Sequence, residues 1–284
     1  MTKGTFMFTK VMLAMDLSEH TDDMLDAFYS LCPDPETEAY SLHVVETAEE
    51  ADPAGSYYKK THSRLRSYAT DIRNAGYDKV EVVWQKERDV LRGIIRAVDK
   101  YDVDLLIMVS HGKGLLESTI SGSNTFNAVR AVDIPTLIVK ETEKESDYLR
   151  RVLLPTDFSR KSLLGLDFLR SMREHVGEVV FVHVVERFRS EDQLREQKEV
   201  AEDMLQELKG EMRDFGINSR YIISTGVASR EICRIAKEED CSLIFTSKTG
   251  AGLVKGLLMG STAQNIALNS ERSLMVTPKY DNDD

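Results

Sequence analysis

The stretch VMLAMDLSEH, residues 11–20, recurs as VLLPTDFSRK, residues 152–161, and this recurrence decides the fold. In each copy an apolar run leads into an aspartate, Asp16 or Asp157, and these aspartates lie 141 positions apart. Self-similarity at a fixed spacing is typical of repeated structural units. The chain of 284 residues is therefore predicted to hold two copies of one domain.

Two further matches follow in the same order along the chain. SLHVVE at 41–46 matches FVHVVE at 181–186, and DLLIMVSHGKG at 104–114 matches SLIFTSKTGAG at 242–252. The charged segment ETEKESDYLR at 141–150 lies between the copies and has the composition of a linker. We therefore expect one domain at 1–142 and a second at 150–280.

Each copy alternates short apolar runs with longer helical patterns, which indicates a parallel sheet covered by helices on both faces. In the first copy the expected strands are 10–14, 39–45, 80–84, 105–109 and 136–139. In the second copy they are 152–155, 178–185, 220–224, 243–246 and 274–277. The predicted fold class is α/β, with two tandem five-stranded parallel-sheet sandwich domains.

Residues with a preference for helix ends place some of the helices. Ser18 is expected to cap the first helix, and Gly76 and Gly216 to close the long helix of each half. Helix four of the first half is expected at 123–132, directly after Gly122.

Composition excludes some partners and cofactors from the expectation. A formal net charge of −11 disfavours nucleic acid and anionic membranes, whereas backbone amides can still bind a small anion. The three cysteines fit no zinc or redox motif, so we expect no redox cofactor, no metal and a reduced, cytoplasmic protein. The first ten residues lack an apolar signal segment.

The loop after strand four is the first candidate for a binding site. Gly112 is followed by nine residues and then Gly122-Ser123, and Gly250 by nine residues and then Gly260-Ser261. Glycines permit close approach of a ligand, and the start of a helix offers free N–H groups to an anion. The pattern fits a phosphate cradle, and a plain glycine turn with an N-cap serine remains the alternative.

The loop after strand one is the second candidate. Asp16 and Asp157 would accept hydrogen bonds from the amino or hydroxyl groups of a ligand, or else cap their own helix together with Ser18 or Ser159. His43 and His183 begin the matching HVV runs at the ends of the second strands, and a structural role is favoured over a catalytic or metal-binding one.

Together these motifs resemble the universal stress protein family, and the whole chain resembles its tandem-domain members. The resemblance implies an α/β sandwich of the adenine nucleotide alpha-hydrolase-like type and, in many members, bound ATP. It implies adenosine contacts at Asp16 and Asp157 and adenine contacts at the strand-two ends, Val44 and Val184. Phosphate contacts would come from Gly112, Gly122 and Ser123 in the first half, and from Gly250, Gly260, Ser261 and Thr262 in the second.

The halves depart from the family pattern to different degrees. The family motif begins with a glycine, but Val109 stands there in the first half and Ser247 in the second. The glycine expected after strand three is present as Gly226, whereas the first half has Glu87 and Asp89 in that region. These carboxylates would repel a triphosphate, so the second half is the better candidate site.

We therefore expect a stress-response regulatory protein that binds ATP or AMP, without efficient catalysis and with an unidentified protein partner. An interaction or chaperone-like protein without nucleotide binding and a slow ATPase are the alternatives. No catalytic pair stands out in the sequence. The resemblance also implies that strands 136–139 and 274–277 pair within one chain, giving a pseudo-twofold, with a homodimer of chains as a further possibility.

Overall fold

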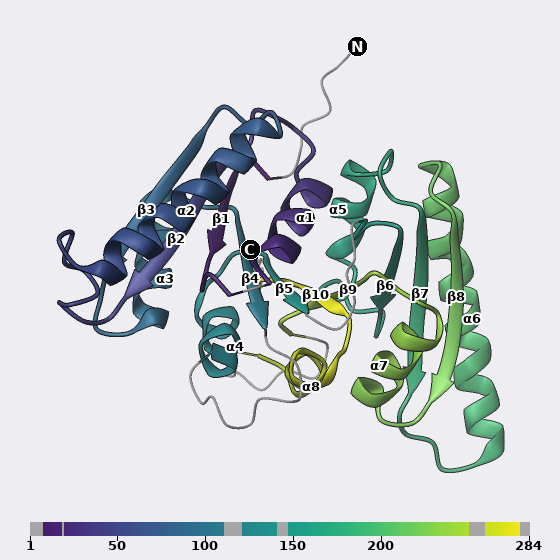
Figure 1. Ribbon diagram of the computed structural model, residues 1–284. Coiled ribbons are helices and arrows are strands. Elements are labelled where there is room, and N and C mark those ends of the chain that lie inside the picture. Colours follow the sequence, from purple (N-terminus) through teal and green to yellow (C-terminus); the bar gives the residue numbers. More distant parts are fainter. Residues whose placement is uncertain (1–7, 19, 111–120, 141–146, 250–258, 279–284) are drawn as a thin grey trace. The chain divides into compact units, whose positions relative to one another are not determined.

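A computed structural model describes residues 8–18, 20–110, 121–140, 147–249 and 259–278. The chain divides into two compact units, a first domain within Phe6–Ser146 and a second within Asp147–Asp284 (Figure 1). Each domain alternates strands with helices, as the sequence predicts.

The elements of the first domain follow the expected order. Its strands are β1 (Lys10–Ala14), β2 (Glu38–Val45), β3 (Val80–Lys86), β4 (Leu105–Ser110) and β5 (Thr136–Lys140). Its helices are α1 (Thr21–Leu31), α2 (Ser56–Asn74), α3 (Val90–Tyr101) and α4 (Ser121–Ala131).

The elements of the second domain repeat this order. Its strands are β6 (Arg151–Pro155), β7 (Glu178–Val185), β8 (Ser219–Thr225), β9 (Leu243–Ser247) and β10 (Ser273–Thr277). Its helices are α5 (Gly165–Ser171), α6 (Glu191–Asp214), α7 (Ala228–Glu238) and α8 (Ser261–Asn269).

Both sheets are parallel and have the same strand order, β3-β2-β1-β4-β5 in the first domain and β8-β7-β6-β9-β10 in the second. The order reverses between β1 and β4, and again between β6 and β9. Ligands of such sheets bind outside the carboxyl ends of the strands at this reversal. The α/β class with five parallel strands per domain is confirmed.

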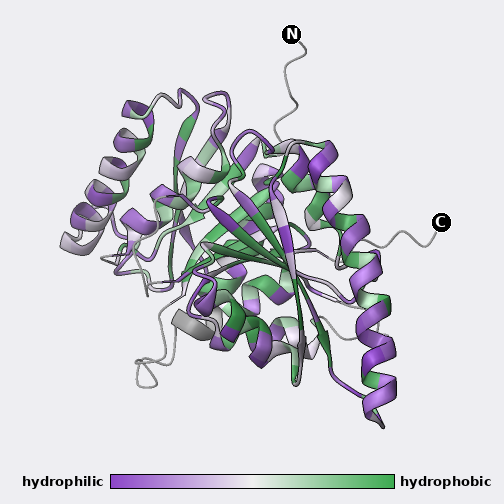
Figure 2. Ribbon diagram, turned by 90° about the vertical axis from the view of Figure 1, so that its right-hand side faces the viewer, coloured by the Kyte–Doolittle hydropathy of each residue, from purple (hydrophilic) through white to green (hydrophobic). Residues whose placement is uncertain are grey.

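The inner strands are buried because helices cover both faces of each sheet, whereas β3 and β8 are only partly buried. All six residues of β4 and the central residues of β6 are buried, and Figure 2 shows apolar residues concentrated in the strands while the long helices carry hydrophilic outer faces. Continuous apolar runs are typical of strands that are covered on both faces.

Two helix starts differ from the prediction. Helix α1 begins at Thr21 with His20 as its N-cap, so Ser18 is not the cap. The Ser18 hydroxyl accepts the His20 N–H (3.3 Å), within a turn before the helix. Helix α4 begins at Ser121 rather than Ser123. The glycines predicted to close the long helices are confirmed, because Gly76 (φ +106°) and Gly216 (φ +76°) have conformations that favour glycine.

Candidate functional site

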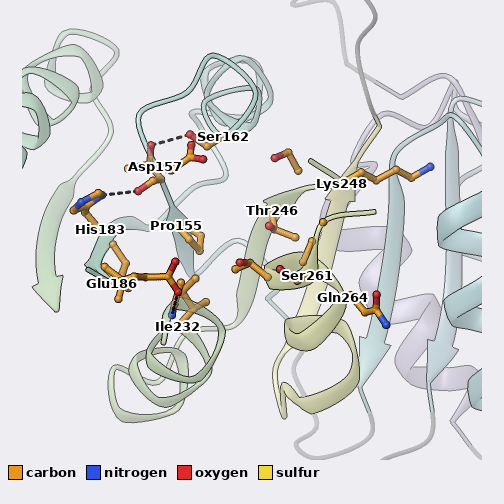
Figure 3. Close-up of a pocket in the computed structure, with 18 of the residues that line it drawn as sticks. Pro155, Asp157, Ser162, His183, Glu186, Ile232, Thr246, Lys248, Ser261 and Gln264 are labelled. Atoms are coloured by element: carbon orange, nitrogen blue, oxygen red, sulfur yellow. Dashed lines mark hydrogen bonds between the residues drawn. The ribbon is translucent and has the colours of Figure 1, made fainter. Parts of the chain in front are cut away.

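A cavity of about 610 Å³ lies in the second domain, outside the carboxyl ends of β6, β7 and β9 (Figure 3). The first turns of α7 and α8 complete its wall. Of the residues predicted to contact a nucleotide, the cavity is lined by Asp157, Val184, Gly260, Ser261 and Thr262. The predicted contacts from three separate segments therefore meet around one space.

Asp157 is exposed and lies in a turn that its own side chain stabilises. Its Oδ1 accepts the Ser159 N–H (3.0 Å), and the intervening Phe158 has φ +62°. A positive φ is costly for a bulky residue, so the aspartate bond helps to hold the turn. The self-capping alternative is thus partly correct, since the carboxylate closes the turn rather than the helix, and it still lines the cavity.

The first domain repeats this turn. Asp16 Oδ1 accepts the Ser18 N–H (3.0 Å), and Leu17 has φ +59°. Asp16 is exposed like Asp157. Two copies with the same left-handed residue after the aspartate indicate that this turn is a fixed part of the domain.

His183 and His43 fasten these turns to the neighbouring strand. His183 Nδ1 donates to the Thr156 carbonyl (2.9 Å), and His43 Nδ1 donates to the Met15 carbonyl (2.8 Å). Each accepting carbonyl belongs to the residue directly before the aspartate. Burial lowers the pKa of His43 below its ordinary 6.5, although the bond to Met15 opposes this shift. Both histidines have the structural contacts expected of them.

The start of α8 forms the anion-binding part of the wall. Gly260 is the N-cap, with extended backbone (φ −72°, ψ 151°), and Ser261 is the first helical residue. Gly260 donates its N–H to the Lys248 carbonyl (2.7 Å), which ties the helix start to the end of β9. The N–H groups of the first turn have no partner inside a helix, and the helix dipole adds partial positive charge there.

Glu186 is a cavity residue that the sequence analysis missed. Its Oε1 accepts the Ala228 N–H (2.8 Å), so this carboxylate caps the start of α7. The cavity therefore has two chemically different ends, with the carboxylates of Asp157 and Glu186, beside Arg187, at one and the N-terminal amides of α8 at the other. The repeated HVVE was the available signal, because Glu186 is its last residue.

The sequence analysis singled out two further positions in the second half, Gly226 and Ser247, and only Ser247 lines the cavity. Gly226 has φ +136°, donates its N–H to the Val185 carbonyl (3.2 Å) and is not among the lining residues. Ser247 lines the cavity from the end of β9, and its hydroxyl donates to the Thr249 carbonyl (2.7 Å). Gly250 lies outside the described residues.

The first domain has a different local structure at the matching positions. Gly122 and Ser123 fall inside the first turn of α4, whereas Gly260 precedes α8. Val109 continues β4, where it pairs with Val139 and is buried. Gly112 and the side chain of Ser123 lie outside the described residues.

The two acidic residues of the first half have local partners. Asp89 Oδ1 accepts the Arg92 N–H (2.8 Å) as the N-cap of α3, and Glu87 forms an ion pair with Arg96. Val44 at the end of β2 is half-buried beneath α3.

Over the part of the chain that the structure describes, no group of three or more His, Cys, Asp or Glu side chains is placed to hold a metal ion. Within the same ranges, none of the helices has the length and apolar character needed to cross a membrane.

Comparison with known proteins assigns the family. Residues 7–140 and 149–278 each match the universal stress protein family. A universal stress protein of Methanocaldococcus jannaschii is 25% identical over 156 residues, covering 46% of this chain and 95% of that protein.

Solved structures show the same fold over nearly the whole chain. A universal stress protein from Archaeoglobus fulgidus has a TM-score of 0.68 at 23% identity, covering 96% of this chain and 97% of the other. A protein of unknown function from Pseudomonas aeruginosa has a TM-score of 0.69 at 14% identity, covering 95% and 93%. With both halves matched, the chain belongs to the universal stress protein family and carries two tandem domains of it.

Proposed function

We propose that the second domain binds an adenine nucleotide, ATP or AMP, in the cavity at the carboxyl ends of β6, β7 and β9. The observation that carries this proposal is the meeting of Asp157, Val184 and the start of α8 around one space. A volume of about 610 Å³ lies within the range of about 300–1,000 Å³ that is common for ligand pockets.

The chemistry of the wall supports one orientation of the nucleotide. The phosphates lie at the first turn of α8, where the amides of Ser261 and Thr262 donate to anionic oxygens. The nucleoside lies toward Asp157 and Glu186, whose carboxylates accept hydrogen bonds from amino and hydroxyl groups. Lys248 lines the cavity, but its side chain points away from the other labelled residues (Figure 3), so its ammonium is not assigned to the phosphates.

We propose a regulatory role for this binding, with no residue assigned to catalysis. Phosphoryl transfer requires a positioned nucleophile and charge-neutralising groups around the transferred phosphate. A nucleotide that binds one conformation of the domain more tightly than another shifts their populations and so informs a partner of its concentration.

The interaction-protein alternative is favoured by one observation, the two carboxylates of Asp157 and Glu186, which among the described residues line the cavity against the single arginine Arg187. Glu186 caps α7 with a carboxylate that lines the cavity, and this negative charge opposes a polyphosphate bound close to it. Under this alternative the cavity binds no nucleotide.

Ser261→Asp tests the phosphate position without weakening the fold. An acidic residue in the first turn of a helix stabilises it by about 0.3–1 kcal/mol, whereas the same charge repels a phosphate bound there. We expect affinity for ATP, measured calorimetrically, to fall by at least about tenfold, while the melting temperature stays equal or rises.

Asn265→Asp is the matched control. It adds the same charge to α8 at an exposed position that does not line the cavity. Equal ATP affinity in the wild type and in both variants would show that no phosphate binds at the first turn of α8.

A further inference from the structure

The two domains differ in how one helix rests on the sheet. Helix α3 of the first domain and α7 of the second both follow the third strand of their sheet. Gly93 and Glu231 are each the fourth residue of their helix. Equivalent positions of the repeat therefore carry the smallest side chain in one domain and a long acidic one in the other.

The strand residues that meet these helices are equivalent by register. Val44 pairs with Gln85 in the first sheet, and Val184 pairs with Ser224 in the second. The valine is common to both domains. Its neighbour on the third strand is long in the first domain and short in the second.

In the first domain α3 lies directly on the valine. A Cβ built on Gly93 would stand 2.4 Å from Val44 Cγ1, a distance that real Cβ atoms essentially never show. The Gln85 side chain reaches past the valine and donates from Nε2 to the Gly93 carbonyl (3.2 Å). A long strand residue and a glycine thus bring the helix backbone onto Val44.

In the second domain the short side chain, Ser224, is on the strand and the long one, Glu231, is on the helix. The Ser224 hydroxyl donates to Glu231 Oε2 (2.6 Å), and Arg234 forms an ion pair with the same carboxylate (2.6 Å). These two donors lower the pKa of Glu231, so the side chain is charged and fixed in place. Its Cγ lies 3.3 Å from a Cβ built on Gly226, which shows close packing over that turn.

The valine of the second domain borders the cavity. Val184 lines the cavity together with Ala228 and Ile232, which belong to α7. The first residue of the helix is also smaller here, since Ala228 stands at the position of Val90.

We infer that Glu231 is a positioning residue, held by Ser224 and Arg234, that keeps the first turn of α7 off Val184 and so keeps the cavity open. The inference rests on the proposed function for the identity of the ligand, but not for the spacing of the helix. It explains why the second domain has a cavity at Val184 where α3 covers Val44.

The double variant Ser224→Gln/Glu231→Gly transfers the first-domain pair into the second domain. We expect its ligand-free crystal structure to show α7 closed onto Val184 and the cavity reduced, and its affinity for ATP to fall by at least about tenfold. An unchanged cavity in this structure would overturn the inference. A closed cavity in a protein whose wild type binds no nucleotide would support the inference and reject the proposed function.

Single variants distinguish loss of the Glu231 contact from a general loss of stability as the cause of weaker nucleotide binding. Glu231→Gln keeps the length and the acceptor for Ser224, so nucleotide affinity is expected to stay within about twofold. Glu231→Ala favours the helix yet removes the contact, so affinity falls. Arg230→Gly is the control for helix weakening, because Arg230 is exposed on the same turn. Wild-type affinity in Glu231→Ala, or an equal loss in Arg230→Gly, would contradict the positioning role.

Discussion

In both domains a histidine near the end of the second strand holds the turn that carries the aspartate. The histidine reaches sideways to the carbonyl that precedes the aspartate, and the aspartate then accepts an N–H two residues further on. The residue between them has a positive φ. In each domain these two hydrogen bonds thus place an exposed carboxylate at the carboxyl end of the first strand, where a ligand can reach it.

His43 gives this arrangement a dependence on pH. Because burial lowers its pKa below 6.5, the unfolded chain binds the proton more readily than the folded domain. The neutral His43 ring therefore contributes its full share to folding stability above about pH 6.5. This share is lost as the pH falls from there toward the folded-state pKa. His62, whose pKa burial also lowers, acts in the same direction.

Urea unfolding between pH 7.5 and 5.5 measures this effect in the first domain. Trp84 is the single tryptophan and lies 5.1 Å from the His43 ring, so its fluorescence reports this domain. We expect wild-type stability to fall with pH more steeply than that of His43→Gln, with His175→Gln at an exposed position of the second domain as the control. Parallel pH profiles for the wild type and His43→Gln would contradict the account.

At this scale the sequence is informative about residues whose role is local. The aspartates, the histidines and the glycines that close the long helices follow from the repeat and from turn chemistry. The repeat marks Glu186 as well, but the hydrogen-bond partners of Glu186 and Glu231, Ala228 and Ser224, do not follow from it, because they are set by the spacing between a helix and a strand. A single sequence carries no direct signal of that spacing.

Among the elements, the starts of α8 and α4 distinguish the two domains. Gly260 precedes α8 as its cap, whereas Gly122 lies within α4. The matched motif predicted equal starts, and the two-residue extension of α4 shows why motif spacing alone does not fix a helix boundary.

Glycines inside helices differ in what surrounds them, which gives a test of packing. Gly210 lies within α6, and a Cβ built there meets nothing within 4 Å. Gly210→Ala is therefore expected to stabilise the protein by about 0.5–1 kcal/mol, because alanine loses less backbone entropy in a helix. Thermal unfolding followed by circular dichroism measures the change.

Gly165 of α5 provides the contrast. A Cβ there would lie 2.7 Å from both Leu154 Cδ1 and Phe245 Cδ1, so Gly165→Ala should lower the melting temperature. A melting temperature that stays unchanged or rises in Gly165→Ala would show that α5 does not pack on the second sheet as described.

At the scale of the whole molecule, duplication has produced two domains with one strand order and different sites. The repeat, the α/β class and the strands could be predicted because buried parallel strands are continuous apolar runs. The difference between the sites could be predicted in part, from Val109 and Gly226. The rest of the difference could not be predicted. It lies in the pair Gln85 and Gly93 of the first domain, which corresponds to Ser224 and Glu231 in the second, and this correspondence is visible only once the strand registers are known.

Pairing of β5 with β10 within one chain stays a prediction from the family resemblance. Such pairing would cover two exposed sheet edges and bring the domains into a compact pseudo-dimer. Small-angle scattering of the full chain is expected to give a single compact particle. A scattering profile of two separated lobes would contradict intramolecular pairing, and a doubled mass would indicate a further dimer of chains.

The central claim, one nucleotide site in the second domain, is tested most directly by calorimetric titration of ATP and AMP into nucleotide-free protein. Gly260 has ordinary backbone angles and room for a Cβ, so Gly260→Val is expected to fold and to obstruct the start of α8. We predict a stoichiometry near one, which Gly260→Val abolishes and Gly122→Val preserves. No heat at millimolar nucleotide, or two equivalent sites per chain, would contradict it.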